Sequence, residues 1–455
     1  MFTVPITRRT FLASTAAATL SGQTKKPNIV IITTDQQFAE SASYRIGRQF
    51  IRTPNMDRIA ANGTVFTRAY CGNPLCVPSR TSIFTGRYCA ETNVYDNDDR
   101  TKIKLDTKKF PIMGTIFKNA GYDTGYFGKW HLPVIEKDLS SHGFDTMDTR
   151  MDDPLTAANA AKFVSAKRDK PFLMMTSLLN PHNIAEWSRG QKLPLGDIGN
   201  PPPLDQLPPV RPNGRPQQNE PDIVSLMRRS YQAAPMFPVS GFDEEKWREY
   251  IWAYYRMIEK VDREIGVVLD AIAKAGLEND TLIVLSADHG DCQGSHGWNQ
   301  KTILYEEATR IPFVLSQKGV TKPGTSKTLV QTGIDIIPTI CAHAGISTPG
   351  GLPGTNVLAP AGRKFVVVEN RMIQGAEIEG KIPTTTGRMV RGERYKYCAY
   401  SNGKQRESLV DLDKDPGEMT NLAVDPKFAK VLADNRANLS AWCKSVNDPF
   451  PVPAS

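Results

Sequence analysis

A run of aliphatic and β-branched residues that ends in an aspartate constrains the fold of this chain more than any other feature. Residues 28–34 read Asn-Ile-Val-Ile-Ile-Thr-Thr, and Asp35 follows them. A short apolar run without polar alternation predicts a strand that is buried on both faces. Similar runs occur at 172–178, 281–287 and 312–315. We therefore expect a sheet whose two faces are both covered.

Helical patterns lie between these expected strands. Residues 113–120 and 244–275 have apolar residues at helical spacing, and a glycine follows each pattern. Alternating strands and helices predict an α/β fold with a large mixed, mainly parallel sheet between helices. In such sheets, functional groups gather beyond the carboxyl ends of the strands. Asp35 and Asp288 both occupy such positions.

The expected larger domain comprises residues 25–360. One region within this domain and one region after it depart from the alternating pattern. Residues 187–240 are polar and rich in proline, which indicates either a linker or a long ordered loop near the site. Residues 361–455 predict a small C-terminal α+β subdomain with an antiparallel sheet. Its expected strands and terminal helix are 364–369, 387–391, 395–400, 408–411 and 426–446.

The first residues of the chain resemble an export signal. Arg8 and Arg9 precede a short, alanine-rich apolar run that ends near Leu20. This arrangement is similar to a twin-arginine signal peptide, here residues 1–24, and the alternative is a frayed basic tail. The resemblance implies a twin-arginine translocase as partner and a periplasmic or secreted location. No cysteine follows the run, and no stretch of about 18 apolar residues occurs, so no membrane anchor is expected.

Composition is ordinary for a globular protein, and the charge does not indicate a nucleic acid partner. The 455 residues are 40% hydrophobic and 23% charged, with a net charge of +8 that is scattered along the chain. This bias does not indicate nucleic acid binding; it suits an anionic substrate or a solvated basic surface. The seven cysteines leave at least one unpaired, and the absence of a Cys-x-x-Cys pair leaves a structural zinc site unsupported.

Cys76 is the cysteine that most needs an explanation, because it lies in what reads as a polar turn, whereas structural cysteines usually lie in apolar runs. The sequence Cys76-Val-Pro-Ser-Arg80 is followed by Thr-Gly-Arg87. This string resembles the signature of the type I sulfatases, a family of the alkaline phosphatase superfamily. The resemblance implies an alkaline phosphatase-like sandwich and oxidation of Cys76 to formylglycine by a formylglycine-generating enzyme.

The chemistry of sulfate esters explains why such an enzyme would need an aldehyde hydrate. One hydroxyl of the hydrate attacks sulfur and forms a covalent sulfate ester. The second hydroxyl, once deprotonated, expels sulfate by C–O cleavage and regenerates the aldehyde. A serine would be left with an ester that water must attack at the same hindered sulfur.

The strand-end residues predict a metal site beside this nucleophile. Asp35-Gln36 and Asp288-His289, with residue 76, offer mainly oxygen ligands, which suit calcium, magnesium or manganese. The family resemblance implies calcium. Many relatives carry Asp-Asp where this chain has Asp35-Gln36. The Asp-Gln pair at this position is similar to that of choline sulfatases and phosphonate monoester hydrolases. A lone aspartate after a strand would otherwise be interpreted as a helix cap.

The resemblance also assigns cations and proton carriers. It implies that Lys129 and Lys301 contact sulfate and that Arg80 holds the hydrate. His131 would deprotonate the second hydroxyl, and His182 would protonate the leaving alcohol. Taken singly, each lysine would be read as a solvated surface residue and each histidine as structural.

Residues 409–423 resemble the segment that ends many sulfatases, so the resemblance extends from about residue 26 to about 425. The sequence therefore predicts an exported sulfatase acting on sulfate monoesters, with a sulfated saccharide as the first choice of substrate. The alternatives are a phosphonate monoester hydrolase or phosphodiesterase with the same nucleophile, a choline sulfatase-like hydrolase of small organosulfates, and an inactive protein that binds sulfated glycans.

Overall fold

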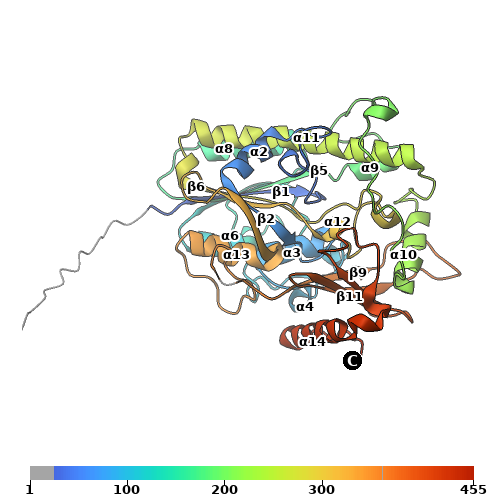
Figure 1. Ribbon diagram of the computed structural model, residues 1–455. Coiled ribbons are helices and arrows are strands. Elements are labelled where there is room, and N and C mark those ends of the chain that lie inside the picture. Colours follow the sequence, from blue (N-terminus) through green and yellow to red (C-terminus); the bar gives the residue numbers. More distant parts are fainter. Residues whose placement is uncertain (1–24, 361, 455) are drawn as a thin grey trace, which may run out of the picture.

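The computed structural model describes residues 25–360 and 362–454, so the expected signal peptide, residues 1–24, lies outside the described residues. Its centre is an eight-stranded sheet in the order β4-β3-β5-β1-β6-β7-β2-β8 (Figure 1). β7 runs antiparallel to both of its neighbours, and the other pairs are parallel. The strands are β1 Asn28–Asp35, β2 Gly63–Tyr70, β3 Asp123–Gly128, β4 Thr146–Asp148, β5 Phe172–Pro181, β6 Thr281–Ala287, β7 Phe313–Ser316 and β8 Gly324–Gln331. The predicted mixed, mainly parallel sheet is confirmed.

Helices cover both faces of this sheet, as the unalternating apolar strands require. Ile29 and Ile31 of β1 point into one hydrophobic cluster, and Val30 and Ile32 point into the other. The second of these clusters is completed by α2 Pro54–Ala61, α8 Asp153–Ser165 and α11 Glu244–Lys274. The first is completed by α3 Cys76–Thr85, α6 Met113–Asn119 and α13 Thr332–His343 (Figure 1).

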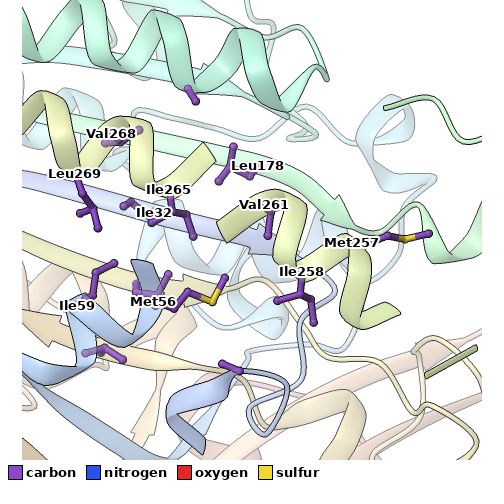
Figure 2. Packing of buried hydrophobic residues seen from close by; sticks show 14 of the residues in the cluster. Ile32, Met56, Ile59, Leu178, Met257, Ile258, Val261, Ile265, Val268 and Leu269 are labelled. Atoms are coloured by element: carbon purple, nitrogen blue, oxygen red, sulfur yellow. The ribbon is translucent and has the colours of Figure 1, made fainter. Parts of the chain in front are cut away.

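α11 is the longest helix and packs along one face of the sheet. Its 31 residues begin after Asp243, whose side chain accepts a hydrogen bond from the backbone N–H of Lys246. Ile258, Val261 and Ile265 recur at helical spacing and face Ile32 of β1 (Figure 2). The remaining helices are α1 Ser43–Ile46, α4 Cys89–Thr92, α5 Asp99–Lys102, α7 Leu139–His142, α9 Ile184–Ser188, α10 Asp222–Ala233, α12 Glu306–Thr309 and α14 Ala429–Val446. Among the described residues, no helix combines the length and the apolar character needed to cross a bilayer.

A second, smaller sheet lies at the C-terminal end of the chain. Its four strands are antiparallel in the order β12-β11-β10-β9, and α14 packs against it (Figure 1). The strands are β9 Val366–Met372, β10 Thr385–Arg391, β11 Tyr395–Tyr400 and β12 Glu407–Asp411. This confirms the small antiparallel sheet predicted from the sequence.

Part of the proline-rich stretch joins the two sheets. Asn213 Nδ2 donates hydrogen bonds to the Glu307 carboxylate at 2.9 Å and to the Gly417 carbonyl at 3.1 Å. The backbone of Gln218 bridges to Thr420. Residues 213–218 are therefore held between α12, which lies between β6 and β7 of the large sheet, and the segment that follows the small sheet.

We expect Asp262 to contribute strongly to stability because it satisfies the first turn of α2. This buried carboxylate accepts hydrogen bonds from the backbone N–H groups of Asn55 at 3.1 Å and Met56 at 2.8 Å. Asp262→Ala leaves both donors unsatisfied, and the free energy of unfolding in urea should fall by about 3 kcal/mol. Asp270→Ala on the same helix removes only an exposed ion pair with Arg58 and should cost less than about 1 kcal/mol. Equal losses for the two variants would contradict this assignment.

Candidate active site

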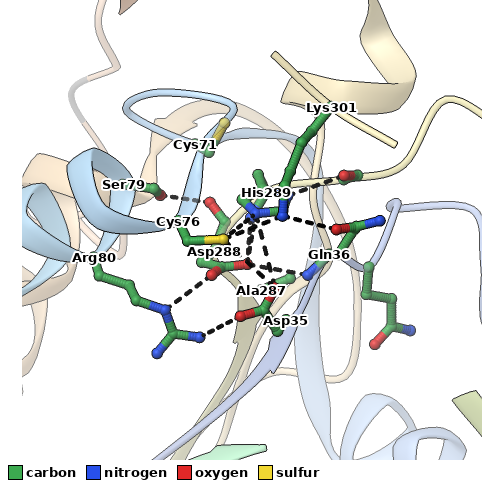
Figure 3. Close-up of polar contacts among 12 residues, drawn as sticks. Asp35, Gln36, Cys71, Cys76, Ser79, Arg80, Ala287, Asp288, His289 and Lys301 are labelled. Carbon is green, nitrogen blue, oxygen red and sulfur yellow. Dashed lines mark hydrogen bonds and ion pairs between the residues drawn. The ribbon is translucent and has the colours of Figure 1, made fainter. Parts of the chain in front are cut away.

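The candidate site lies at the carboxyl edge of the large sheet, where β1 and β6 end side by side. Thr34 pairs with Ala287 in the parallel ladder, so Asp35 and Asp288 follow at the same edge (Figure 3). Cys76 is fully buried and is the first residue of α3, not part of a turn as its polar surroundings suggested. The helix N-terminus thus points its first side chain at the two strand ends.

Four potential ligand atoms converge here, all within 4.8 Å of one another: Asp35, Asp288, His289 and Cys76 each contribute one. Cys76 Sγ lies 3.2 Å from His289 Nε2 and 3.9 Å from Asp35 Oδ1. His289 Nε2 lies 3.6 Å from Asp288 Oδ1. Separations of this size fit ligands that share one cation with bonds of about 2.3–2.6 Å.

Arg80 fixes the orientation of both carboxylates. It lies one helical turn after Cys76 and therefore on the same face of α3. Its Nη2 donates to Asp35 Oδ2 and its Nε donates to Asp288 Oδ2, both at 3.0 Å (Figure 3). Its Nη1 donates to Ser177 Oγ at 2.6 Å and to the Lys129 carbonyl at 2.9 Å. The outer carboxylate oxygens are thus engaged by Arg80, while the inner Oδ1 atoms face Cys76 and His289.

Two buried lysines approach the Cys76 sulfur from different elements. Lys129 follows β3, and its Nζ lies 2.6 Å from Asp35 Oδ2 and 3.8 Å from Cys76 Sγ. Lys301 comes from the loop before α12, and its Nζ lies 3.1 Å from Cys76 Sγ and 2.8 Å from Gln36 Oε1. The space around the sulfur is therefore strongly electropositive, which suits an anionic group.

The cations around residue 76 shift the pKa values of Cys76 and Asp35. Burial alone would raise the pKa of the Cys76 thiol, but Lys129, Lys301 and His289 lower it well below its usual value. Burial and the Cys76 sulfur also favour the protonated form of Asp35, yet Lys129, His182 and Arg80 outweigh them and hold its pKa far below its usual range. The site therefore favours a negative charge on residue 76 and on Asp35.

The two predicted acid–base histidines border the same sulfur. His131 lies two residues after Lys129, and His182 follows the end of β5. The Cys76 side chain acts on the pKa of both imidazoles, while burial lowers each of them. His131 Nδ1 is buried and has no hydrogen-bond partner among the described residues. These histidines thus join the other sequence-predicted residues around Cys76, and burial favours the neutral form of His131 and His182.

Gln36 adopts a left-handed backbone conformation with φ of 70° and holds two neighbours. Its Nε2 donates to Asp291 Oδ2 at 2.7 Å, while its Oε1 accepts from Lys301. The hydroxyl of Tyr250 also donates to Asp291 Oδ2, at 3.0 Å. Both atoms of the Gln36 amide are thus hydrogen-bonded to protein groups, and metal ligation by Gln36 stays a prediction. Asp291 was given no role from the sequence, although its place two residues after His289 was a usable signal.

A second buried group of possible ligands, His296, Glu307 and Glu418, lies near the C-terminal sheet. Lys396 Nζ lies 2.8 Å from Glu418 Oε1, and Asn213 donates to Glu307 at 2.9 Å. The carboxylates of Glu418 and Glu307 are therefore already engaged by Lys396 and Asn213. These contacts connect the segments that carry the four residues.

Comparisons with known proteins identify the family of this chain. The sulfatase family model matches residues 27–346, and a model described as the C-terminal part of N-sulphoglucosamine sulphohydrolase matches residues 294–444. A Delta 4,5-hexuronate-2-O-sulfatase of Bacteroides thetaiotaomicron is 31% identical over 94% of this chain and 90% of its own length. An N-acetylglucosamine-6-O-sulfatase of the same organism is 25% identical over 94% of this chain and 88% of its own.

Solved structures give the same result. A structure described as a 2-O GAG sulfatase superposes with a TM-score of 0.81 and 29% identity, covering 94% of both chains. The family model covers well over half of the chain, and the relatives match across nearly all of it. The chain belongs to the sulfatase family and is a sulfuric ester hydrolase.

Proposed function

We propose that this protein is an exported sulfatase that removes sulfate from a sulfated saccharide, using formylglycine at residue 76 and a divalent cation. The observation that carries the proposal is the convergence of Asp35, Asp288, His289, Lys129 and Lys301 on the one side chain of residue 76. Saccharide specificity is supported by the names of the relatives, which act on a 2-O-sulfated hexuronate and on N-acetylglucosamine 6-O-sulfate. Export and the translocase rest on residues 1–24 alone.

The Cys76 sulfur marks where one hydroxyl of the hydrated aldehyde would lie. Once formed, the hydrate supplies one hydroxyl that captures the sulfuryl group and a second that releases it. The signature Cys-Val-Pro-Ser-Arg80 supports this conversion and a formylglycine-generating enzyme as partner. The cations around the sulfur lower the pKa of the thiol and would act on a hydroxyl there in the same direction.

Asp35, Asp288 and His289, with residue 76, would hold the cation. The carboxylate and hydroxyl oxygens of this set suit calcium, with manganese or magnesium as alternatives, and the His289 imidazole would be the single nitrogen ligand. The fit is supported by the inner Oδ1 atoms, which face the cluster while Arg80 engages the outer ones. The ion would lower the pKa of the nucleophilic hydroxyl and neutralise charge on the sulfate oxygens.

The lysines and histidines divide the remaining tasks. The ammonium groups of Lys129 and Lys301 come from separate elements and both contact the Cys76 sulfur. They would hold the sulfate oxygens so that the sulfur of the substrate lies in line with the nucleophile. His131, with its unpartnered Nδ1, suits removal of a proton from residue 76. Burial, Lys301 and Lys129 lower the pKa of His182 in the free site. An anionic sulfate group would offset the charge of both lysines and favour the protonated imidazole that the leaving alcohol needs.

Gln36 is the observation that keeps phosphonate monoester hydrolysis as a second candidate. A neutral amide here makes the site less negative than an aspartate would, and it directs its oxygen to Lys301. A choline sulfatase-like activity has less support. Residues 93–97 also resemble choline sulfatases, but Tyr95, the aromatic residue among them, already packs against the guanidinium groups of Arg371 and Arg388, whose carbons lie 4.8 and 5.4 Å from its ring centre.

Purified protein should hydrolyse an aryl sulfate faster than an aryl phosphonate monoester, and a panel of defined sulfated saccharides with choline sulfate should identify a saccharide as the preferred substrate.

Cys76→Ala removes the proposed nucleophile and should abolish turnover. Cys71→Ala provides the matched control because Cys71 is equally buried, packs in a hydrophobic cluster, and makes its polar contact with the Ala308 carbonyl, at 4.0 Å. Unchanged turnover in Cys76→Ala would remove the mechanism, and tight saccharide binding without turnover by the unaltered protein would favour the glycan-binding alternative.

Calcium should stabilise the metal-stripped protein against thermal unfolding. At a free concentration about 100 times the dissociation constant, binding contributes about 2.7 kcal/mol. Asp288→Asn replaces one proposed ligand and should abolish most of the calcium-dependent rise in Tm. Glu418→Gln changes the second buried group and should leave that rise intact. Loss of the calcium-dependent rise in Tm in Glu418→Gln, with a full rise in Asp288→Asn, would contradict this assignment and indicate that calcium binds the group of His296, Glu307 and Glu418.

A further inference from the structure

Lys301 is held in a strained loop between the short helical turn Ser295–Gly297 and α12. The residues on either side of it adopt positive φ values, 55° at Gln300 and 80° at Thr302. For a β-branched residue such as Thr302, this conformation costs on the order of 1–3 kcal/mol. Strain of this kind persists only where the surroundings hold the backbone in place.

Three hydrogen bonds hold this loop. The Gln300 carbonyl accepts from the backbone N–H of Cys292 at 2.7 Å. The N–H of Thr302 donates to the Pro74 carbonyl at 3.0 Å, which ties the loop to the segment before Cys76. The Thr302 carbonyl accepts from Asn370 Nδ2 at 2.7 Å. The last of these bonds comes from β9, a strand of the C-terminal sheet.

The Asn370 side chain lies in space that the missing side chain of Gly387 leaves open. Asn370 is 1% exposed and pairs across the β9–β10 ladder with Gly387. A Cβ atom on Gly387 would lie 2.5 Å from Asn370 Oδ1 and 2.9 Å from a methyl carbon of Leu304. Gly387 does not have a positive φ, so its backbone conformation does not require glycine. Glycine is needed here for the space that Asn370 occupies.

The residue before Asn370 holds the other side of the site. The backbone N–H of Glu369 donates to the Gly72 carbonyl at 3.1 Å. Its carboxylate accepts from the backbone N–H groups of Cys89 at 2.8 Å and Ala90 at 2.9 Å. Two consecutive residues of β9 therefore hold the loop that carries Lys301 and the segments on both sides of α3.

We propose that Asn370 is a positioning residue for the reaction: through the Thr302 carbonyl, it keeps the Lys301 ammonium against residue 76. The proposal deepens the proposed function and rests on it only in assigning Lys301 to the sulfate group. It makes the C-terminal sheet part of the catalytic apparatus, although none of its side chains touches the nucleophile in the described structure.

The direct test is a crystal structure of Asn370→Ala compared with one of the unaltered protein. Without the donor on its carbonyl, Thr302 should leave the left-handed region, and Lys301 Nζ should withdraw from residue 76. Because misplacement by about 1 Å can cost 100-fold, kcat/KM for an aryl sulfate should fall by about 10- to 100-fold. The same loss should vanish in a Lys301→Ala background, since residues that act through one another are not additive.

Two further variants separate positioning from general destabilisation. Asn435→Ala removes a comparable buried amide, which donates at 2.9 Å to the Val431 carbonyl within α14. Its effect on Tm should resemble that of Asn370→Ala, while kcat/KM should stay within about twofold and any loss should add to that of Lys301→Ala. Gly387→Ala leaves every polar group in the chain but fills the space of Asn370, and it should reproduce the loss of kcat/KM.

The outcomes for the two proposals are distinct. An Asn370→Ala crystal structure with Thr302 and Lys301 unmoved overturns the positioning role, whatever the protein hydrolyses. Full additivity of Asn370→Ala with Lys301→Ala overturns it as well. Absence of turnover by the unaltered protein instead counts against the proposed function, and the crystal structures still decide the role of Asn370.

Discussion

The bridge that Arg80 makes between two strand-end aspartates is the interaction on which the rest of the site depends. The buried guanidinium pairs with both carboxylates, and removal of Arg80 would leave the outer oxygens of both without this partner in a buried site, which is strongly destabilising. Because Arg80 lies one turn after Cys76, this bridge orients the helix that presents residue 76. It also turns one oxygen of each carboxylate toward the place where a cation would bind.

The architecture brings this bridge about through separate parts of the chain. β1 and β6 supply the carboxylates because adjacent parallel strands end at one edge. α3 supplies Arg80, β3 leads to Lys129, and β5 leads to His182. The loop of Lys301 is tied to β9 by the hydrogen bond from Asn370 to the Thr302 carbonyl.

Sequence reasoning reached the features that are local or that form strong motifs. The expected strand at 281–287 matches β6, and the expected helix at 244–275 ends one residue after α11, because continuous apolar runs and helical spacing are local signals. β2 and β8 escaped notice because polar residues interrupt them. α3 was read as a turn because its polar residues are buried against the site and not exposed. Asn370 could not be predicted, since its role exists only through a contact 68 positions away in sequence.

Everything in the proposed chemistry requires that residue 76 no longer be a thiol in the active protein. Mass spectrometry of the peptide that contains residue 76, from protein that hydrolyses sulfate esters, tests this most directly. The account predicts the mass loss that accompanies conversion of a thiol to an aldehyde, and capture of that aldehyde by a hydrazide. A peptide with an intact thiol in every molecule of an active preparation would contradict it.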